Sequence, residues 1–114
     1  MSRPLVIIES PYAADTTVGI AANRTYARAA VADSLARGEA PFASHLLYTQ
    51  PGVLDDTDPQ QRHHGIAAGL DIAARADLTA VYTDRGISPG MRQGLRHALH
   101  HGRPIQYRTI GDPA

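Results

Sequence analysis

The chain has 114 residues, enough for one hydrophobic core and too few for two. Hydrophobic residues make up 43% of it and charged residues 19%, a balance typical of a globular domain rather than a disordered chain. Eleven basic residues match eleven acidic ones, so no excess of positive charge favours a nucleic acid polymer as a partner. The chain has no cysteine, which excludes a disulfide scaffold, a thiolate metal site and a cysteine nucleophile.

The amino-terminal apolar run is short. It comprises only Leu5-Val6-Ile7-Ile8, which is too short for the hydrophobic region of a signal peptide or for a membrane-spanning helix. We therefore expect one cytoplasmic domain over residues 1–114, with no membrane contact.

Signals for strands alternate with signals for helices along the chain. The continuous apolar run at 5–8 is typical of a strand buried on both faces. Asp58-Pro59 and Ser88-Pro89 each place an N-cap residue before a proline at the first helical position. We predict strands at 5–8, 40–45, 78–82 and 104–107, helices at about 17–37, 59–74 and 89–101, and a loop over 48–58.

The apolar spacing within the three helices predicts which side chains they bury. These are Ile20, Ala27, Val31 and Leu35 in the first helix, Ile66, Leu70 and Ala74 in the second, and Met91, Leu95, Ala98 and Leu99 in the third.

Strands that alternate with helices form a mostly parallel sheet joined by right-handed crossovers. We predict an α/β domain with about four parallel strands in the order 2-1-3-4 and helices on both faces. In that order the chain changes direction between the first and third strands, where ligands bind at the carboxyl ends. The loops over 10–15 and 83–88 should therefore meet at a ligand site.

The start of the third helix is the first candidate site. The cap Ser88, the proline at N1 and Gly90 leave backbone N–H groups free at a helix start, and Met91 follows directly. The helix dipole adds positive charge there, so a phosphate or carboxylate is a natural ligand, and Gly90 would allow close approach. The alternative is an ordinary well-capped helix.

The second candidate is Ser10-Pro11-Tyr12, which follows the first strand. A hydroxyl, a rigid turn and an aromatic ring could hold a sugar or a base. The alternative is an ordinary turn that ends the strand. The sequence has no G-x-G-x-x-G after this strand and no Walker-type loop, which argues against classical dinucleotide and nucleoside triphosphate sites.

An ordered set of short segments extends this pattern over nearly the whole chain, from about Leu5 to Tyr107. The set comprises Glu9-Ser10-Pro11-Tyr12, Asn23, Tyr26, residues 41–47, 54–56 and 62–65, Gly69-Leu70, residues 76–82 and residues 87–91. Together these segments resemble the small nucleoside 2-deoxyribosyltransferase-like domains of bacteria and their phages. The resemblance implies a flavodoxin-like, Rossmannoid three-layer sandwich, a nucleoside or nucleotide ligand, and a homodimer or larger oligomer.

In active members of that family, the resemblance implies that a glutamate attacks the anomeric carbon of the deoxyribose. It commonly lies in a pattern like S-x-G-M-x-x-E, after the third strand. The matching residue here is Gly94, which carries no nucleophile.

A replacement carboxylate would have to come from elsewhere. The candidates are Glu9, Asp15, Asp55, Asp56 and Asp84, of which Glu9 is best placed because the first strand ends at the switch point. A carboxylate at Glu9 could equally bind ribose hydroxyls without reacting, and Asp56 and Asp84 are further candidate ligand-binding residues.

The histidines differ in how well they are placed for ligand binding, catalysis or metal binding. His45 ends the second predicted strand near the cleft and could orient a phosphate or base or act as a general acid, or could simply be packed. His97 and His101 have metal-ligand spacing, but no carboxylate accompanies them. We therefore expect neither a metal site nor a cofactor.

Two main hypotheses follow. The first is a nucleotide-binding protein without catalysis, which Gly94 favours. The second is an active N-glycosidase or deoxyribosyltransferase that uses a relocated carboxylate such as Glu9. An interaction module is a third reading, which leaves the capped helix site unexplained.

Overall fold

The computed structural model describes residues 2–111. Its elements alternate along the chain as the sequence predicts, with one short helix added. In chain order they are β1 (Leu5–Glu9), α1 (Thr17–Ala36), β2 (Ala40–Phe42), α2 (Ser44–Leu47), α3 (Pro59–Ala73), β3 (Leu78–Tyr82), α4 (Pro89–His100) and β4 (Ile105–Arg108).

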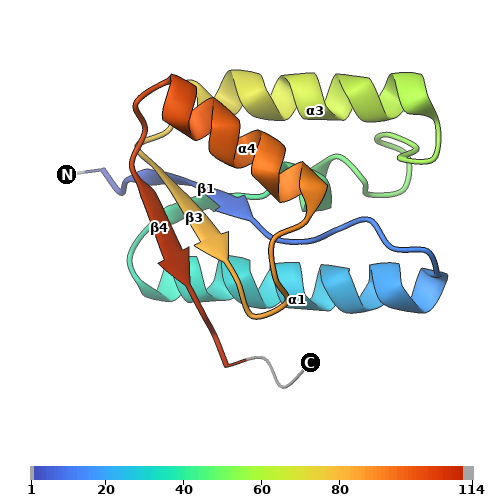
Figure 1. The fold of residues 1–114 in the computed structure, drawn as a ribbon, viewed down its shortest axis with the longest axis horizontal. Coiled ribbons are helices and arrows are strands. Elements are labelled where there is room, and N and C mark those ends of the chain that lie inside the picture. The colour runs from blue at the N-terminus through green and yellow to red at the C-terminus, as the bar shows by residue number, and fades with distance from the viewer. Residues whose placement is uncertain (1, 112–114) are drawn as a thin grey trace.

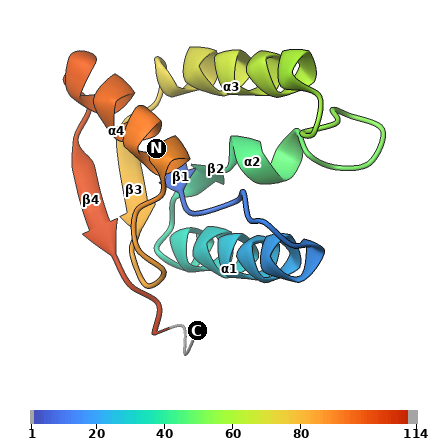
Figure 2. The same cartoon turned by 45° about the vertical axis from the view of Figure 1, so that its right-hand side comes forward.

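The four strands form one parallel sheet in the order β2-β1-β3-β4. Helix α1 covers one face of the sheet, and α3 and α4 cover the other (Figures 1 and 2). This is the flavodoxin-like three-layer arrangement, so the predicted fold class and strand order are confirmed. The carboxyl ends of β1 and β3 lie together, because Glu9 pairs in register with Val81.

The central strands supply most of the core. Val6, Ile8 and Tyr82 are buried, and they pack with Tyr26 and Ala30 of α1. Burial on both faces explains why β1 reads as an unbroken apolar run rather than an alternating one.

The predicted caps are confirmed at two helix starts. Asp58 accepts from the backbone N–H of Gln60 at 3.0 Å, and Ser88 accepts from that of Met91 at 3.3 Å. Both helices have proline at N1, where the missing N–H costs nothing.

The prediction of a strand over 40–45 is wrong beyond Phe42. The chain turns at Ala43 and forms the short helix α2, which packs against α3. A Cβ on Gly69 of α3 would lie 2.9 Å from the side chain of Ser44, so the glycine allows the two helices to approach closely. This contact between distant segments cannot be read from local strand propensity.

Three of the predicted buried side chains are exposed. Leu35 and Leu99 are 50% and 71% exposed, and Ala74 lies in the cap that ends α3. On α1 Ser34 is buried instead of Leu35, and its hydroxyl is satisfied by a hydrogen bond that it donates to Glu39 at 2.7 Å.

A buried ion pair joins β4 to the start of β2. Arg108 donates from Nη1 and Nη2 to the two carboxylate oxygens of Glu39, at 2.8 and 2.7 Å. These hydrogen bonds hold the pKa of Glu39 below its usual value. Arg108 also donates to the hydroxyl of Tyr82 at 3.1 Å, and Tyr82 donates to Asp33 at 2.7 Å. The network ties both edges of the sheet to α1.

No helix within residues 2–111 has the length and apolar character needed to cross a membrane.

Breaking the buried ion pair between Arg108 and Glu39 should reduce the free energy of unfolding more than breaking an exposed ion pair does. Arg108→Met leaves the Glu39 carboxylate buried without its partner, and we expect the free energy of unfolding to fall by about 3–5 kcal/mol. The control Arg37→Gln removes a pair with Asp33 in which the arginine side chain is 42% exposed, and should cost under about 1 kcal/mol. Urea denaturation at neutral pH measures both changes. Equal losses in the two variants would contradict a structural role for the buried pair.

Candidate functional site

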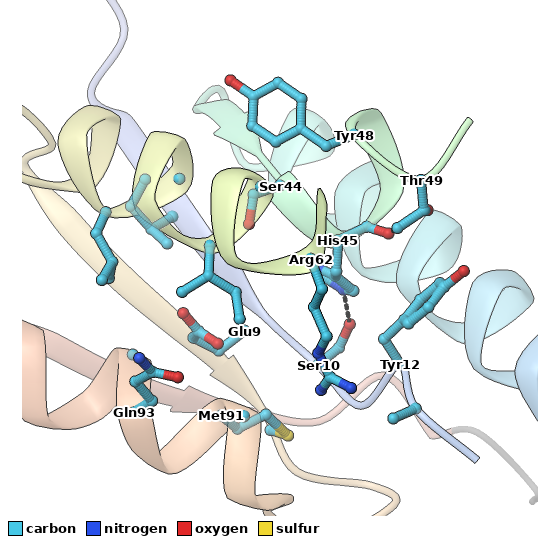
Figure 3. Close-up of a pocket in the computed structure, with 18 of the residues that line it drawn as sticks. Glu9, Ser10, Tyr12, Ser44, His45, Tyr48, Thr49, Arg62, Met91 and Gln93 are labelled. Carbon is cyan, nitrogen blue, oxygen red and sulfur yellow. Dashed lines mark hydrogen bonds between the residues drawn. The ribbon is translucent and has the colours of Figure 1, made fainter. Parts of the chain in front are cut away.

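A cavity of about 300 Å³ lies at the carboxyl ends of β1 and β2 and reaches the start of α4, the helix that follows β3. Of the two loops predicted to meet at the site, 10–15 contributes Ser10, Tyr12 and Ala13, whereas 83–88 contributes Ser88. The lining of the cavity comes from the end of β1 and the turn after it, from α2, from α3 and from the first half of α4 (Figure 3). Apolar side chains such as Phe42, Ile66 and Leu70 form part of its walls. Ligand pockets of proteins are typically of this size or larger.

Glu9, the last residue of β1, directs its carboxyl group into the cavity (Figure 3). Burial raises the pKa of this group to about 8, although the positive charge of Arg103 acts in the opposite direction. Glu9 is therefore mostly protonated at neutral pH. In that form the group can both donate and accept a hydrogen bond.

Gly94 on α4 lies directly against this carboxyl group. A Cβ on residue 94 would lie 2.9 Å from Oε1 of Glu9 and closer still to Oε2. Any side chain at this position would therefore displace Glu9. The absence of a side chain at position 94 therefore makes room for a carboxyl group supplied by β1.

Arg103, which precedes β4, also lines the cavity. It is 7% exposed, and it donates to the hydroxyl of Thr79 at 2.8 Å and to the carbonyl of Ala73 at 2.7 Å. Sequence reasoning missed Arg103, because its position between Gly102 and Pro104 reads as a turn before a strand.

Ser10 and His45 form a hydrogen-bonded pair in the wall of the cavity. The Ser10 Oγ and His45 Nε2 atoms are 2.7 Å apart, and both residues line the cavity. Burial lowers the pKa of His45 to about 4, so its imidazole is neutral at neutral pH. A neutral imidazole bonded to a hydroxyl can orient a polar ligand group, but it is a poor general acid.

Tyr12 lines the cavity and is held by two residues of α1. Its hydroxyl accepts from Arg24 at 2.9 Å, and its backbone carbonyl accepts from Asn23 at 2.9 Å. Its ring meets the His45 ring edge-on at 6.3 Å. The aromatic face is thus fixed before any ligand arrives.

The start of α4 also borders the cavity, through Ser88, Pro89, Gly90 and Met91. Its donors are fewer than the sequence suggests. Proline has no N–H, and the N–H of Met91 is bonded to Ser88, while the Ser88 N–H points to the Met91 sulfur at 3.4 Å. Within residues 2–111 this leaves the N–H of Gly90 as the free donor of the first three helical residues.

Arg62 in the first turns of α3 lines the cavity and extends toward Ser10 (Figure 3). Within residues 2–111 its guanidinium has no hydrogen-bond or ion-pair partner. Sequence reasoning missed it as a site residue. The signal was present, since a cation near a helix amino terminus opposes the helix dipole and calls for another explanation.

Of the remaining predicted site residues, some line the cavity and some do not. Asp56 lines the cavity, whereas Pro11, Asp15 and Asp55 lie outside its lining. Asp84 also lies outside it and instead accepts from the Tyr26 hydroxyl at 2.6 Å and from backbone N–H groups near the carboxyl terminus.

Other cavity residues that the sequence did not single out are Ser44, Tyr48, Thr49 and Gln93. Within residues 2–111 no group of three or more potential metal-ligating side chains is found. His97 of α4 and His101, the C-cap of that helix, stack with their ring centroids 4.0 Å apart.

Fold and cavity together define a flavodoxin-like α/β domain with a candidate ligand pocket at its switch point. A protein-family model, Domain of unknown function (DUF7768), matches residues 4–108, so the chain belongs to the DUF7768 family. The matched region includes all four strands and the whole pocket lining. A search of curated proteins found no match.

The raised pKa of Glu9 should appear in the pH dependence of stability. Between pH 4.5, the ordinary pKa of the group, and about pH 8, the folded protein keeps a proton that the unfolded chain has released. The contribution of Glu9 to the free energy of unfolding therefore falls by about 1.4 kcal/mol per pH unit across this window. Glu9→Gln removes the titrating group. The free energy of unfolding of the variant should therefore rise relative to that of the wild type as the pH rises.

Urea denaturation of both proteins across this pH range measures the difference. His45 changes stability in the opposite direction below pH 6.5, but it is common to both proteins and cancels. A stability difference that does not change with pH would show that Glu9 titrates normally.

Proposed function

We propose that this protein binds a nucleoside or nucleotide in the cavity between the carboxyl end of β1 and the start of α4. The observation that carries the proposal is the convergence there of apolar walls, the fixed ring of Tyr12 and the Ser10–His45 pair. Apolar and aromatic surfaces suit the faces of a base, and hydroxyl and imidazole groups suit a sugar. The resemblance to the deoxyribosyltransferase-like domains supports the same ligand class.

The charges in the cavity are consistent with this ligand class. The neutral His45 and the mostly protonated Glu9 are both suited to hydrogen bonds with an uncharged group, such as a base or a sugar. The unpaired guanidinium of Arg62 and the free N–H of Gly90 could receive a phosphate if the ligand carries one.

A second candidate is an enzyme that acts on the N-glycosidic bond, and the contact between Glu9 and Gly94 favours it. The resemblance implies a carboxylate on α4, and here a carboxylate from β1 fills the space beside that position. In such a reaction the ionised Glu9 would attack the anomeric carbon, and the bond to the base would break. The base would leave with the electron pair and take up a proton, and water would hydrolyse the resulting ester.

Binding is tested by calorimetric titration with nucleosides, deoxynucleosides and their monophosphates. Tyr12→Ala should weaken binding by about tenfold or more, since it removes an aromatic wall from the pocket. Tyr107→Ala is the matched control, because Tyr107 lies on β4 outside the cavity lining and is 60% exposed. If the wild type binds none of these compounds, the proposed function is wrong.

Catalysis is tested by chromatographic detection of free base after incubation with the same compounds. Release should rise as the pH approaches 8, because about a tenth of Glu9 is ionised at neutral pH. Glu9→Gln should abolish it, and Gly94→Ala should reduce it by displacing the carboxyl group. Arg96→Ala, exposed on α4, should leave it unchanged. Binding without release in the wild type would exclude the enzyme and leave the binding protein.

A further inference from the structure

The guanidinium of Arg103 is held in one orientation by three hydrogen bonds. All three nitrogens of its guanidinium donate to neutral acceptors: Nε to the Thr79 hydroxyl at 2.8 Å, Nη1 to the Ala73 carbonyl at 2.7 Å and Nη2 to His97 Nδ1 at 3.0 Å. Strand β3, the end of α3 and helix α4 each supply one of these acceptors. The cation is therefore held from three sides.

These acceptors give each guanidinium nitrogen of Arg103 a hydrogen bond, but they do not balance its charge. A buried cation is costly without a counter-charge, and burial accordingly lowers the pKa of Arg103. The opposite charge that acts on it is Glu9, which also lines the cavity. Within residues 2–111 the two groups form no direct ion pair, so the attraction between them acts at longer range.

His97 links this arrangement to the helix that carries Gly94. Its Nδ1 atom accepts from Arg103, so this nitrogen must be unprotonated. Burial, together with the charges of His101, Arg103 and His100, lowers the pKa of His97 and keeps it neutral near neutral pH. One turn of α4 thus positions both the gap that receives the Glu9 carboxyl group and the acceptor that fixes Arg103.

We propose that Arg103 is the positioning residue for Glu9, and that it stabilises the ionised carboxylate from a position fixed by His97. Arg103 determines how readily the carboxyl group at the end of β1 gives up its proton. The other ionisable groups that line the cavity are Tyr12, His45, Tyr48, Asp56 and Arg62.

The sequence offers a direct measurement, because Glu9 and Glu39 are its only two glutamates. Labelling the glutamate side-chain carboxyl carbon with ¹³C gives two NMR signals that can be followed through a pH titration without any ligand. Glu39 is an internal reference, since its ion pair with Arg108 lies on the α1 side of the sheet. Glu9→Gln assigns the signals.

Arg103→Met should raise the proton affinity of Glu9 by about tenfold and leave Glu39 unchanged, because it removes the positive charge. His97→Phe keeps a ring beside His101 but removes the acceptor, so it should give a smaller shift of Glu9 in the same direction. Arg103→Lys should restore most of the wild-type titration, since it restores the charge.

The His97→Phe and Arg103→Lys variants keep the proposal testable if Arg103→Met does not fold. An unchanged Glu9 titration in Arg103→Met, or in His97→Phe where only that variant folds, would overturn the proposal. The result is independent of the proposed function, because the titration uses no ligand. If the titration of Glu9 shifts as expected in the variants while the wild type binds no nucleoside, the proposed function is wrong and the proposed role of Arg103 is supported.

Discussion

The close fit between the carboxyl group of Glu9 and Gly94 is the constraint on which the candidate site depends. Strand β1 ends with an acidic residue directed into a cavity, and α4 can lie over that residue only because position 94 has no side chain. The same fit keeps the carboxyl group out of bulk water, and burial raises its pKa. Packing and proton affinity at this site therefore have one physical cause.

Besides this contact, the protein has two buried arginines, Arg103 and Arg108, which differ in how their charge is balanced. The pair of Arg108 and Glu39 is bidentate and lies on the α1 side of the sheet. On the opposite side, Arg103 meets only neutral acceptors, and Glu9, the carboxyl group whose charge acts on it, is mostly protonated at neutral pH.

Much of the fold was predictable because its signals are local. The apolar runs identified β1 and β3, and the two cap-and-proline signals identified the starts of α3 and α4. The placement of Ser10 and Tyr12 beside the cavity followed from the strand order, whereas His45 reaches it from α2 and not from the end of a strand. The short helix α2 was missed, because Gly69 of α3 allows its packing and lies far away in the sequence.

The sequence by itself determined the class of fold, the strand order and the edge of the sheet where the site lies, since hydrophobic period, caps and crossover handedness depend on near neighbours along the chain. It also showed that position 94 lacks the carboxylate that the resemblance implies. Only the tertiary structure decided that Glu9 occupies that space and that Arg103 and Arg62 join the cavity. Those relations depend on distances between segments far apart in sequence, which only chain packing fixes.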